Sequence, residues 1–309
     1  MNKLTNNKNH FCLGLSKPLD IFNNNVRKLI YFVLENNLYI HTSISYPINF
    51  FLFKFFLHKD RRHKIKFICK ILANNLENFN RTVDLTLKKY SIKKIHILQL
   101  INLPISKNFF RDKDSLEFSE FEKILNSIKE LKKNEIIDKV YIQILSKDTL
   151  EFCKKMNHHF DGFAFYANIN EINLKKEVYE FIIKNNIPSL ILSVFGNPKE
   201  SKVSSNLHLE SYRFSQNFFS ENTIPVGRTL NLSRLKDILN DNKINNLHFN
   251  PRFVETDEMQ DTAENFYKRY KVTNLYYIFI FVVKCLTKKI IGQKAWLYLK
   301  SIYKKKYEN

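Results

Sequence analysis

The sequence alternates between apolar runs and amphipathic stretches, and this alternation limits the folds that the chain can adopt. The runs are rich in Ile, Leu, Val and Phe on both faces, and they recur about every thirty residues: 11–15, 38–41, 66–71, 95–101, 139–145, 161–166, 189–195 and 223–226. Runs of this kind are typical of parallel strands that are buried on both faces.

Stretches of helical period lie between these runs. Their apolar residues recur on one face, as in helices that pack against a sheet; they cover 25–36, 80–90, 119–132, 175–185 and 233–240. Ser119 and Glu122 have the spacing of a capping box, which predicts that a helix starts at Ser119. Asn37, Asn134 and Asn186 lie just before strand-like runs, and they are predicted to adopt the left-handed conformation that ends a helix.

Eight βα units in about 240 residues predict a (β/α)8 TIM barrel over residues 1–245. A doubly wound open sheet is the main alternative, but it normally has fewer strands and a Gly-rich first turn. The chain has only 5 glycines in 309 residues and contains neither GxGxxG nor GxxxxGK[ST]. Residues 246–309 are predicted to form a C-terminal extension with an apolar run and a Lys-rich amphipathic tail.

The charge is strongly positive, with 50 Lys and Arg against 30 Asp and Glu. Residues 284–309 contain eight Lys and one Glu, and therefore carry +7 of the net +20. Two interpretations of this basic tail stay open: a solvated terminal helix that caps the barrel, or a segment that lies on an anionic membrane surface. Four aromatic residues interleave with its lysines, as in interfacial segments: Trp296, Tyr298, Tyr303 and Tyr307.

The remaining composition argues against several other classes of protein. The four cysteines are far apart and form no CxxC pair, so neither a zinc site nor a disulfide framework is expected, and no metal is predicted. The basic residues are spread out and no nucleic-acid-binding motif occurs. The first ten residues lack the apolar core of a secretory signal, so a cytoplasmic location is expected, with peripheral membrane contact as an addition.

Several segments, in their order along the chain, resemble the aldo-keto reductases between about residues 11 and 240. Residues 37–46 (NLYIHTSISY) resemble the family's strand that ends in D-T-A/S-x-x-Y. The other matching segments are 66–70 (the strand that ends in the family's lysine), 95–101 (I-D-L-x-x-L-H), 161–168 (the strand that ends in Y-N), 192–195 (R-S-V-F) and 225–235 (the last strand and the helix that grips the cofactor phosphate).

The resemblance implies that Tyr46 donates a proton to a substrate carbonyl and that Lys70 supplies the positive charge that assists it. His41 stands where the family has an aspartate that pairs with the lysine, and Ile101 stands where it has a histidine that orients the carbonyl. A neutral His41 could accept a hydrogen bond from Lys70 but carries no negative charge. Because Ile101 can neither donate nor accept, these two substitutions are expected to weaken catalysis.

The resemblance also implies NADP or NAD as cofactor. The residues that it places around the cofactor are Asn168, Ser193, Gly227, Arg228, Asn231, Ser233 and Arg234. A helix start with hydroxyl groups and arginines can hold a phosphate without a Gly-rich loop. The nicotinamide end departs from the family pattern, since Gln143-Ile144 replaces Ser-Asn and Ala164 replaces Gln.

Two hypotheses follow from these observations. The first is an NAD(P)H-dependent oxidoreductase that reduces a carbonyl of a small molecule or sugar, with its activity lowered by the substitutions at 41 and 101. The second is a non-catalytic pseudo-reductase that acts as a binding or scaffold protein, at an anionic membrane surface in one version of this hypothesis.

Overall fold

The computed structural model describes residues 11–15, 24–46, 53–54, 57–103, 116–144, 147–155, 159–196, 207–219, 222–229, 231–241, 249–254, 266–267 and 275–292, with 295, 296 and 298.

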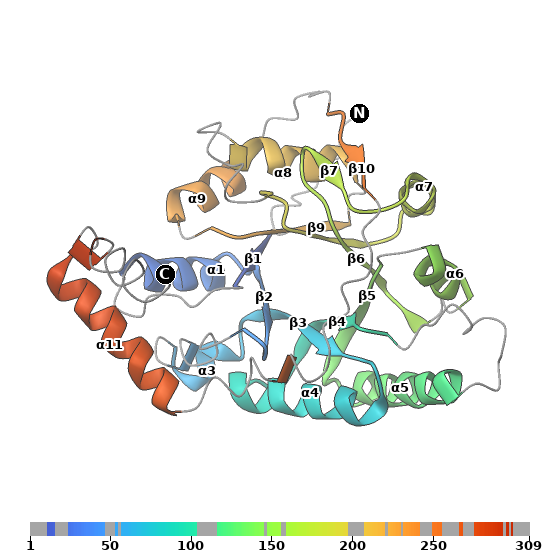
Figure 1. Ribbon diagram of the computed structural model, residues 1–309, viewed down its shortest axis with the longest axis horizontal. Coiled ribbons are helices and arrows are strands. Elements are labelled where there is room, and N and C mark those ends of the chain that lie inside the picture. Colours follow the sequence, from blue (N-terminus) through green and yellow to red (C-terminus); the bar gives the residue numbers. More distant parts are fainter. Residues whose placement is uncertain are drawn as a thin grey trace, which may run out of the picture.

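Eight parallel strands form a closed barrel, which confirms the predicted fold (Figure 1). In ring order they are β1 (Cys12–Gly14), β2 (Tyr39–Ser43), β3 (Lys66–Leu72), β4 (Ile95–Ile101), β5 (Ile137–Gln143), β6 (Gly162–Tyr166), β8 (Ser189–Leu192) and β9 (Thr223–Gly227). The ring closes at β1, where Leu13 is in register with Ile40 on one side and with Gly227 on the other.

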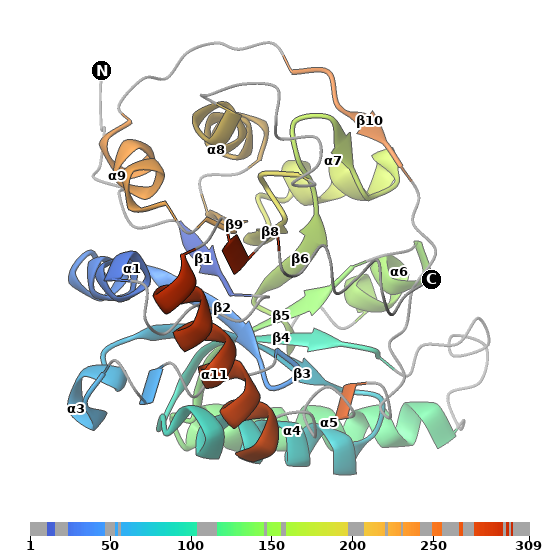
Figure 2. The same cartoon turned by 60° about the vertical axis from the view of Figure 1, so that its left-hand side comes forward.

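Helices surround the barrel as an outer layer (Figure 2). They are α1 (Asn24–Glu35), α3 (Lys59–Arg62), α4 (Leu76–Tyr90), α5 (Leu116–Lys133), α6 (Lys147–Lys155), α7 (Lys176–Lys184), α8 (Leu207–Phe218) and α9 (Leu232–Asn240). In α1 the buried residues are Val26, Leu29, Ile30 and Val33, which is the one-face spacing predicted for a helix that packs on a sheet.

Two local predictions about helix ends need correction. Helix α5 begins at Leu116, so Ser119 lies inside the helix and the predicted capping box is wrong. Asn37 and Asn186 do have the left-handed conformation, with φ of 54° and 47°. At the third joint the left-handed residue is Glu135 (φ 57°) and not Asn134, because α5 runs on to Lys133 before it ends.

The segment after α9 contacts the rest of the protein at several places, which include the packing of Phe249 and of Phe281, Val282 and Cys285 of the last helix on the core. Strand β10 (Arg252–Phe253) pairs with β7 (Glu171–Ile172), and Phe266 and Tyr267 are buried against residues at the ends of β2 and β3. Helix α11 (Leu275–Ile291) lies at the periphery of the molecule (Figure 1), whereas Tyr303 and Tyr307 lie outside the described residues. Within the described residues, every helix is too short or too polar to cross a lipid bilayer. The division at residue 245 stays a prediction.

The barrel interior changes from apolar to polar toward the carboxyl ends of its strands. One apolar cluster fills it: Cys12, Ile68, Ile97, Tyr141, Ala164, Leu190, Leu192, Ile224 and Val226. Side chains two positions apart in a strand share a face, so Lys70 follows Ile68 and Gln99 follows Ile97 on the inner side. The register pairs Lys70 with Gln99, which places both at one level of the barrel.

Candidate functional site

Lys70 is the centre of a polar group at the mouth of the barrel. Its ammonium lies close enough to the phenols of Tyr46 and Tyr166 for both to raise its pKa. The Nζ atom lies 5.7 Å from the centroid of the Tyr46 ring. Tyr46 follows β2 after a short turn and Tyr166 ends β6, so the closed barrel brings together three residues that are far apart in the sequence.

Lys70 remains charged although it is largely surrounded by protein. Burial by itself lowers the pKa of Lys70, but the two phenol oxygens raise that pKa by more, and the net shift is upward. No carboxylate of the described residues forms an ion pair with Lys70. The mouth of the barrel therefore holds a positive charge that lies beside two phenols.

His41 lies beneath this group in a chain of neutral side chains. Its Nε2 donates to Oε1 of Gln99 at 2.7 Å, and Nε2 of Gln99 donates to Oε1 of Gln143 at 2.9 Å. Burial and the Lys70 charge lower the pKa of His41 to about 3, against the opposing effect of the Gln99 hydrogen bond. The ring is therefore neutral near pH 7.

The hydrogen bond that a neutral His41 could accept from Lys70 does not form between these two described residues. His41 donates its Nε2 proton to Oε1 of Gln99, and Lys70 lies beside the phenols of Tyr46 and Tyr166.

Ile101 lies in an apolar cluster at the rim. Its neighbours in this cluster are Ile44, Leu72, Leu85, Phe266 and Tyr267. The Tyr267 hydroxyl is 3.0 Å from Oγ1 of Thr82 and donates to the carbonyl oxygen of Asn78 at 3.2 Å, which fastens this aromatic pair to α4. Where the resemblance places a histidine, the structure therefore has an apolar wall.

Gln99 and Tyr166 are the members of this site whose roles the sequence did not reveal. Gln99 is a single polar residue in the middle of the buried run IHILQLI, and this position could have signalled a partner inside the barrel. Tyr166 is the last residue of a buried strand, at the edge where barrel sites form.

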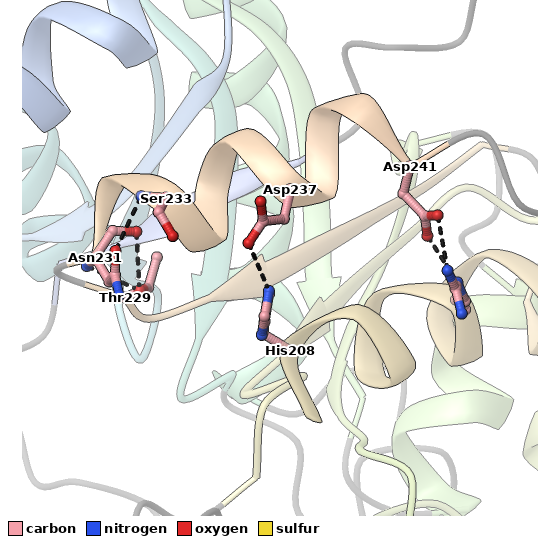
Figure 3. A network of polar contacts seen from close by, with 7 residues as sticks. His208, Thr229, Asn231, Ser233, Asp237 and Asp241 are labelled. Carbon is pink, nitrogen blue, oxygen red and sulfur yellow. Dashed lines mark hydrogen bonds and ion pairs between the residues drawn. The ribbon is translucent and has the colours of Figure 1, made fainter. Parts of the chain in front are cut away.

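The start of α9 presents polar groups to solvent. Asn231 is the N-cap, and its Oδ1 accepts a hydrogen bond from the Ser233 amide at 2.9 Å, while Oγ1 of Thr229 accepts one from the Asn231 amide at 3.1 Å (Figure 3). Arg228, Asn231, Ser233 and Arg234 are all exposed. A capped helix start with two exposed arginines has the chemistry to hold a phosphate.

Helix α8 contacts the C-terminal half of α9 (Figure 3). Arg213 makes a two-point contact with Asp241, with nitrogen–oxygen distances of 2.8 and 2.9 Å. Nε2 of His208 lies 3.4 Å from a carboxylate oxygen of Asp237. These contacts hold the C-terminal half of α9 against α8.

Gly227 has a packing role that the sequence did not show. A Cβ atom at this position would lie 2.4 Å from the Phe195 ring and 2.7 Å from the Phe11 ring. These two rings stack, with centroids 6.0 Å apart. The absence of a side chain therefore makes room for the aromatic pair.

The other two residues predicted to contact the cofactor lie after β6 and β8. Oδ1 of Asn168 accepts hydrogen bonds from the amides of Asn170 (2.9 Å) and Glu171 (3.3 Å), so this oxygen holds a turn. Ser193 follows β8 directly, is exposed and has a left-handed backbone (φ 58°).

Comparisons with known proteins give the fold a context. No model of a protein family matches the sequence, and no curated protein matches it. Among solved structures, a putative aldo-keto reductase from Pseudomonas aeruginosa matches with a TM-score of 0.54 and 15% identity over 74% of this chain and 87% of that chain.

Two further solved structures carry a cofactor in their descriptions. An aldo/keto reductase from Klebsiella pneumoniae, in complex with NADP and acetate, matches with a TM-score of 0.53 and 8% identity over 75% of this chain and 86% of that one. A Bombyx mori aldo-keto reductase in complex with NADP matches with a TM-score of 0.54 and 11% identity over 85% and 88%. The barrel therefore has the fold of the aldo-keto reductases.

Proposed function

We propose that this chain, with its barrel of the aldo-keto reductase type, is an NAD(P)H-dependent oxidoreductase that reduces a carbonyl of a small molecule or sugar. The observation that carries the proposal is the contact of Lys70 with Tyr46 at the carboxyl ends of the barrel strands, where Nζ lies 5.7 Å from the ring centroid and the phenol raises the pKa of the ammonium. Active sites of such barrels lie at this end. The substitutions at 41 and 101 lower the rate.

In this mechanism the Tyr46 hydroxyl donates its proton to the carbonyl oxygen of the substrate. The Lys70 ammonium stabilises the phenolate that remains, because opposite charges close together attract strongly at a partly buried site. His41, being neutral, adds no negative charge beside the ammonium. The apolar wall at Ile101 offers no donor, so orientation of the carbonyl depends on the phenols.

The residues at the start of α9 fit the phosphate end of a dinucleotide. When bound, a reduced nicotinamide supplies the hydride. Arg228, Ser233 and Arg234 would hold its phosphates, with Asn231 capping the helix beneath them. The nicotinamide end is less complete, since the oxygens of Gln143 and Asn168 are used within the protein. The NADP complexes of the Klebsiella pneumoniae and Bombyx mori structures support NADP, and NAD is the alternative.

The test has two stages. NADPH and NADH are titrated against the protein by fluorescence, and then turnover with a panel of carbonyl compounds is followed by the absorbance of the reduced cofactor. We expect binding, slow turnover, and loss of turnover in Lys70→Met. Lys129→Met on the exposed face of α5 is the matched control. Binding without turnover would favour the pseudo-reductase, and no binding of either cofactor would contradict both the activity and the phosphate residues.

The second candidate function is a peripheral attachment to an anionic membrane surface, and α11 favours it. Phe279, Val283, Leu286 and Ile290 lie at helical spacing on one stripe and are exposed, Phe279 by 65% and Ile290 by 80%. Lysines 284, 288 and 289 accompany this stripe. An apolar stripe with lysines beside it is typical of helices that lie at a membrane interface.

Co-sedimentation with vesicles tests this attachment. We expect binding to vesicles that contain phosphatidylserine, weaker binding to pure phosphatidylcholine, and loss of binding in the double variant Phe279→Asp with Ile290→Asp. Ile183→Asp on α7 removes an exposed apolar residue elsewhere and serves as the control. Equal binding of all three proteins would contradict the attachment through α11.

A further inference from the structure

We infer that a groove on the outside of the barrel, between α1, α3 and α9, binds a multiply phosphorylated small molecule. These three helices lie along the same side of the molecule in both views (Figures 1 and 2). The groove has a volume of about 550 Å³ and is lined by residues of all three helices. This volume falls in the range of about 300–1,000 Å³ that is usual for small-molecule sites.

The groove is positively charged on all sides. Arg27 and Lys28 come from α1, Arg61 from α3 and Lys236 from α9, against one carboxylate, Glu35. None of the four cations forms an ion pair within the described part of the chain. Four cations and one carboxylate leave a net charge of +3, and their mutual repulsion would be relieved by a bound anion.

Aromatic rings form the floor and hold two of these cations in place. The Arg61 guanidinium lies 5.3 Å from the centroid of Tyr31, and Nζ of Lys236 lies 6.0 Å from the centroid of Phe32. Cations within about 6 Å of a ring face are attracted to it, which limits the freedom of these side chains before a ligand arrives. Similar contacts occur elsewhere, as between Lys154 and Phe181, so what distinguishes the groove is that four cations from three helices converge on it.

The charge and the donor types indicate the class of ligand. Two guanidinium groups can bind phosphate oxygens in pairs, and two ammonium groups add point charges. A net +3 matches a di- or triphosphate better than a single carboxylate. Arg234, at the start of α9, does not line this groove whereas Leu232 does, so the groove borders the predicted cofactor phosphate residues but has its own four cations.

The experiment is a calorimetric titration with inorganic pyrophosphate at two salt concentrations. The groove variant is Arg27→Glu with Arg61→Glu, which leaves α9 untouched. The control is Lys129→Glu with Lys133→Glu on α5, where both lysines are exposed and the change in net charge is the same. We expect the groove variant to bind at least about tenfold more weakly and the control to stay within about twofold of the original protein.

Three results would overturn the inference. They are no binding of pyrophosphate by the original protein, an equal loss in the groove and control variants, and a loss that appears in Arg234→Glu but not in the groove variant. A parallel arm with phosphatidic acid vesicles identifies the source of the phosphate: binding of vesicles but not of pyrophosphate assigns the groove to a lipid headgroup and contradicts a soluble ligand.

Discussion

The mouth of the barrel and the start of α9 satisfy their polar groups in different ways. At the mouth, Lys70 lies beside two phenols and His41 is hydrogen-bonded to Gln99, so these polar side chains interact with one another. At the start of α9, Asn231 caps the helix while Arg228 and Arg234 extend into solvent. The polar groups of the first region interact with one another in the folded protein, whereas the second region has exposed donors that can bind a ligand. Substitutions at the mouth should therefore change chemistry and stability, and those at α9 mainly affinity.

The largest expected effect separates the two phenols on Lys70. If Tyr46 is the proton donor, Tyr46→Phe should lower kcat/KM by about 10²–10⁴, the usual contribution of a general acid. Tyr166→Phe should cost only about tenfold, because it removes one partner of the ammonium and leaves the donor in place. Tyr298→Phe, at an exposed position, is the control. A reversed order would make Tyr166 the donor.

Acid should lower the stability of the folded protein because His41, at the mouth, is buried and neutral. The pKa of His41 is lowered from 6.5 to about 3 by folding, so between these values the unfolded chain binds the proton and the folded protein does not. The free energy of unfolding should thus be highest above pH 6.5 and fall on acidification, by up to about 1.4 kcal/mol per pH unit from this group.

Urea unfolding across this pH range measures the effect. His41→Asn should have a shallower pH dependence than the original protein, and the exposed His58→Asn should keep the original slope. If both variants behave like the original protein, His41 does not carry the linkage.

A smaller loss of stability is expected when the hydrogen bonds from His41 to Gln99 and from Gln99 to Gln143 are broken. Gln99→Leu leaves the Nε2 proton of His41 and Oε1 of Gln143 without their partner. Leaving buried polar groups unpaired costs about 1–3 kcal/mol, and the urea midpoint should fall accordingly. Asn126→Leu, on the exposed face of α5, provides the comparison. No change in Gln99→Leu would mean that the contact adds nothing to stability.

The smallest effect belongs to the start of α9. Asn231→Ala should lower the free energy of unfolding by about 1 kcal/mol, since the Ser233 amide loses its cap. Asn240→Ala, at the other end of the helix, lacks this effect. Cofactor affinity should be measured on the same proteins. At α9 we expect a large loss of affinity with a small loss of stability. The opposite pattern would mean that the start of α9 behaves like the mouth of the barrel.

The order of strands and helices could be predicted from the sequence because each element carries its own periodicity. Local chemistry also predicted the left-handed Asn37 and Asn186, since an Asn side chain tolerates that backbone. The start of α5 could not be fixed in this way, because a capping motif has the same letters inside a helix as at its end.

The contacts at the mouth depend on how the strands tilt when the barrel closes. A family motif aligned Tyr46 with Lys70, and the structure brings these two residues together. The resemblance covered Tyr166 only as part of the strand that ends in Y-N and gave no sign that it lies beside Lys70, or that His41 bonds with Gln99. Such pairs depend on the register and tilt of four strands relative to one another, and neither can be predicted from the sequence of a single strand.

The short pairing between β7 and β10 links distant parts of the chain mechanically. The backbone carbonyl oxygen of Tyr166, which ends β6, accepts a hydrogen bond from the amide of Asn173, just after β7. The amides of Arg252 and Val254 donate to the carbonyl oxygens of Asn170 and Ile172. A chain that ends before Arg252 would lack the pairing between β7 and β10. The segment after β6, at the mouth of the barrel, is thus held by β10, which lies some eighty residues further along the chain. It can become fully ordered only after β10 has been synthesised.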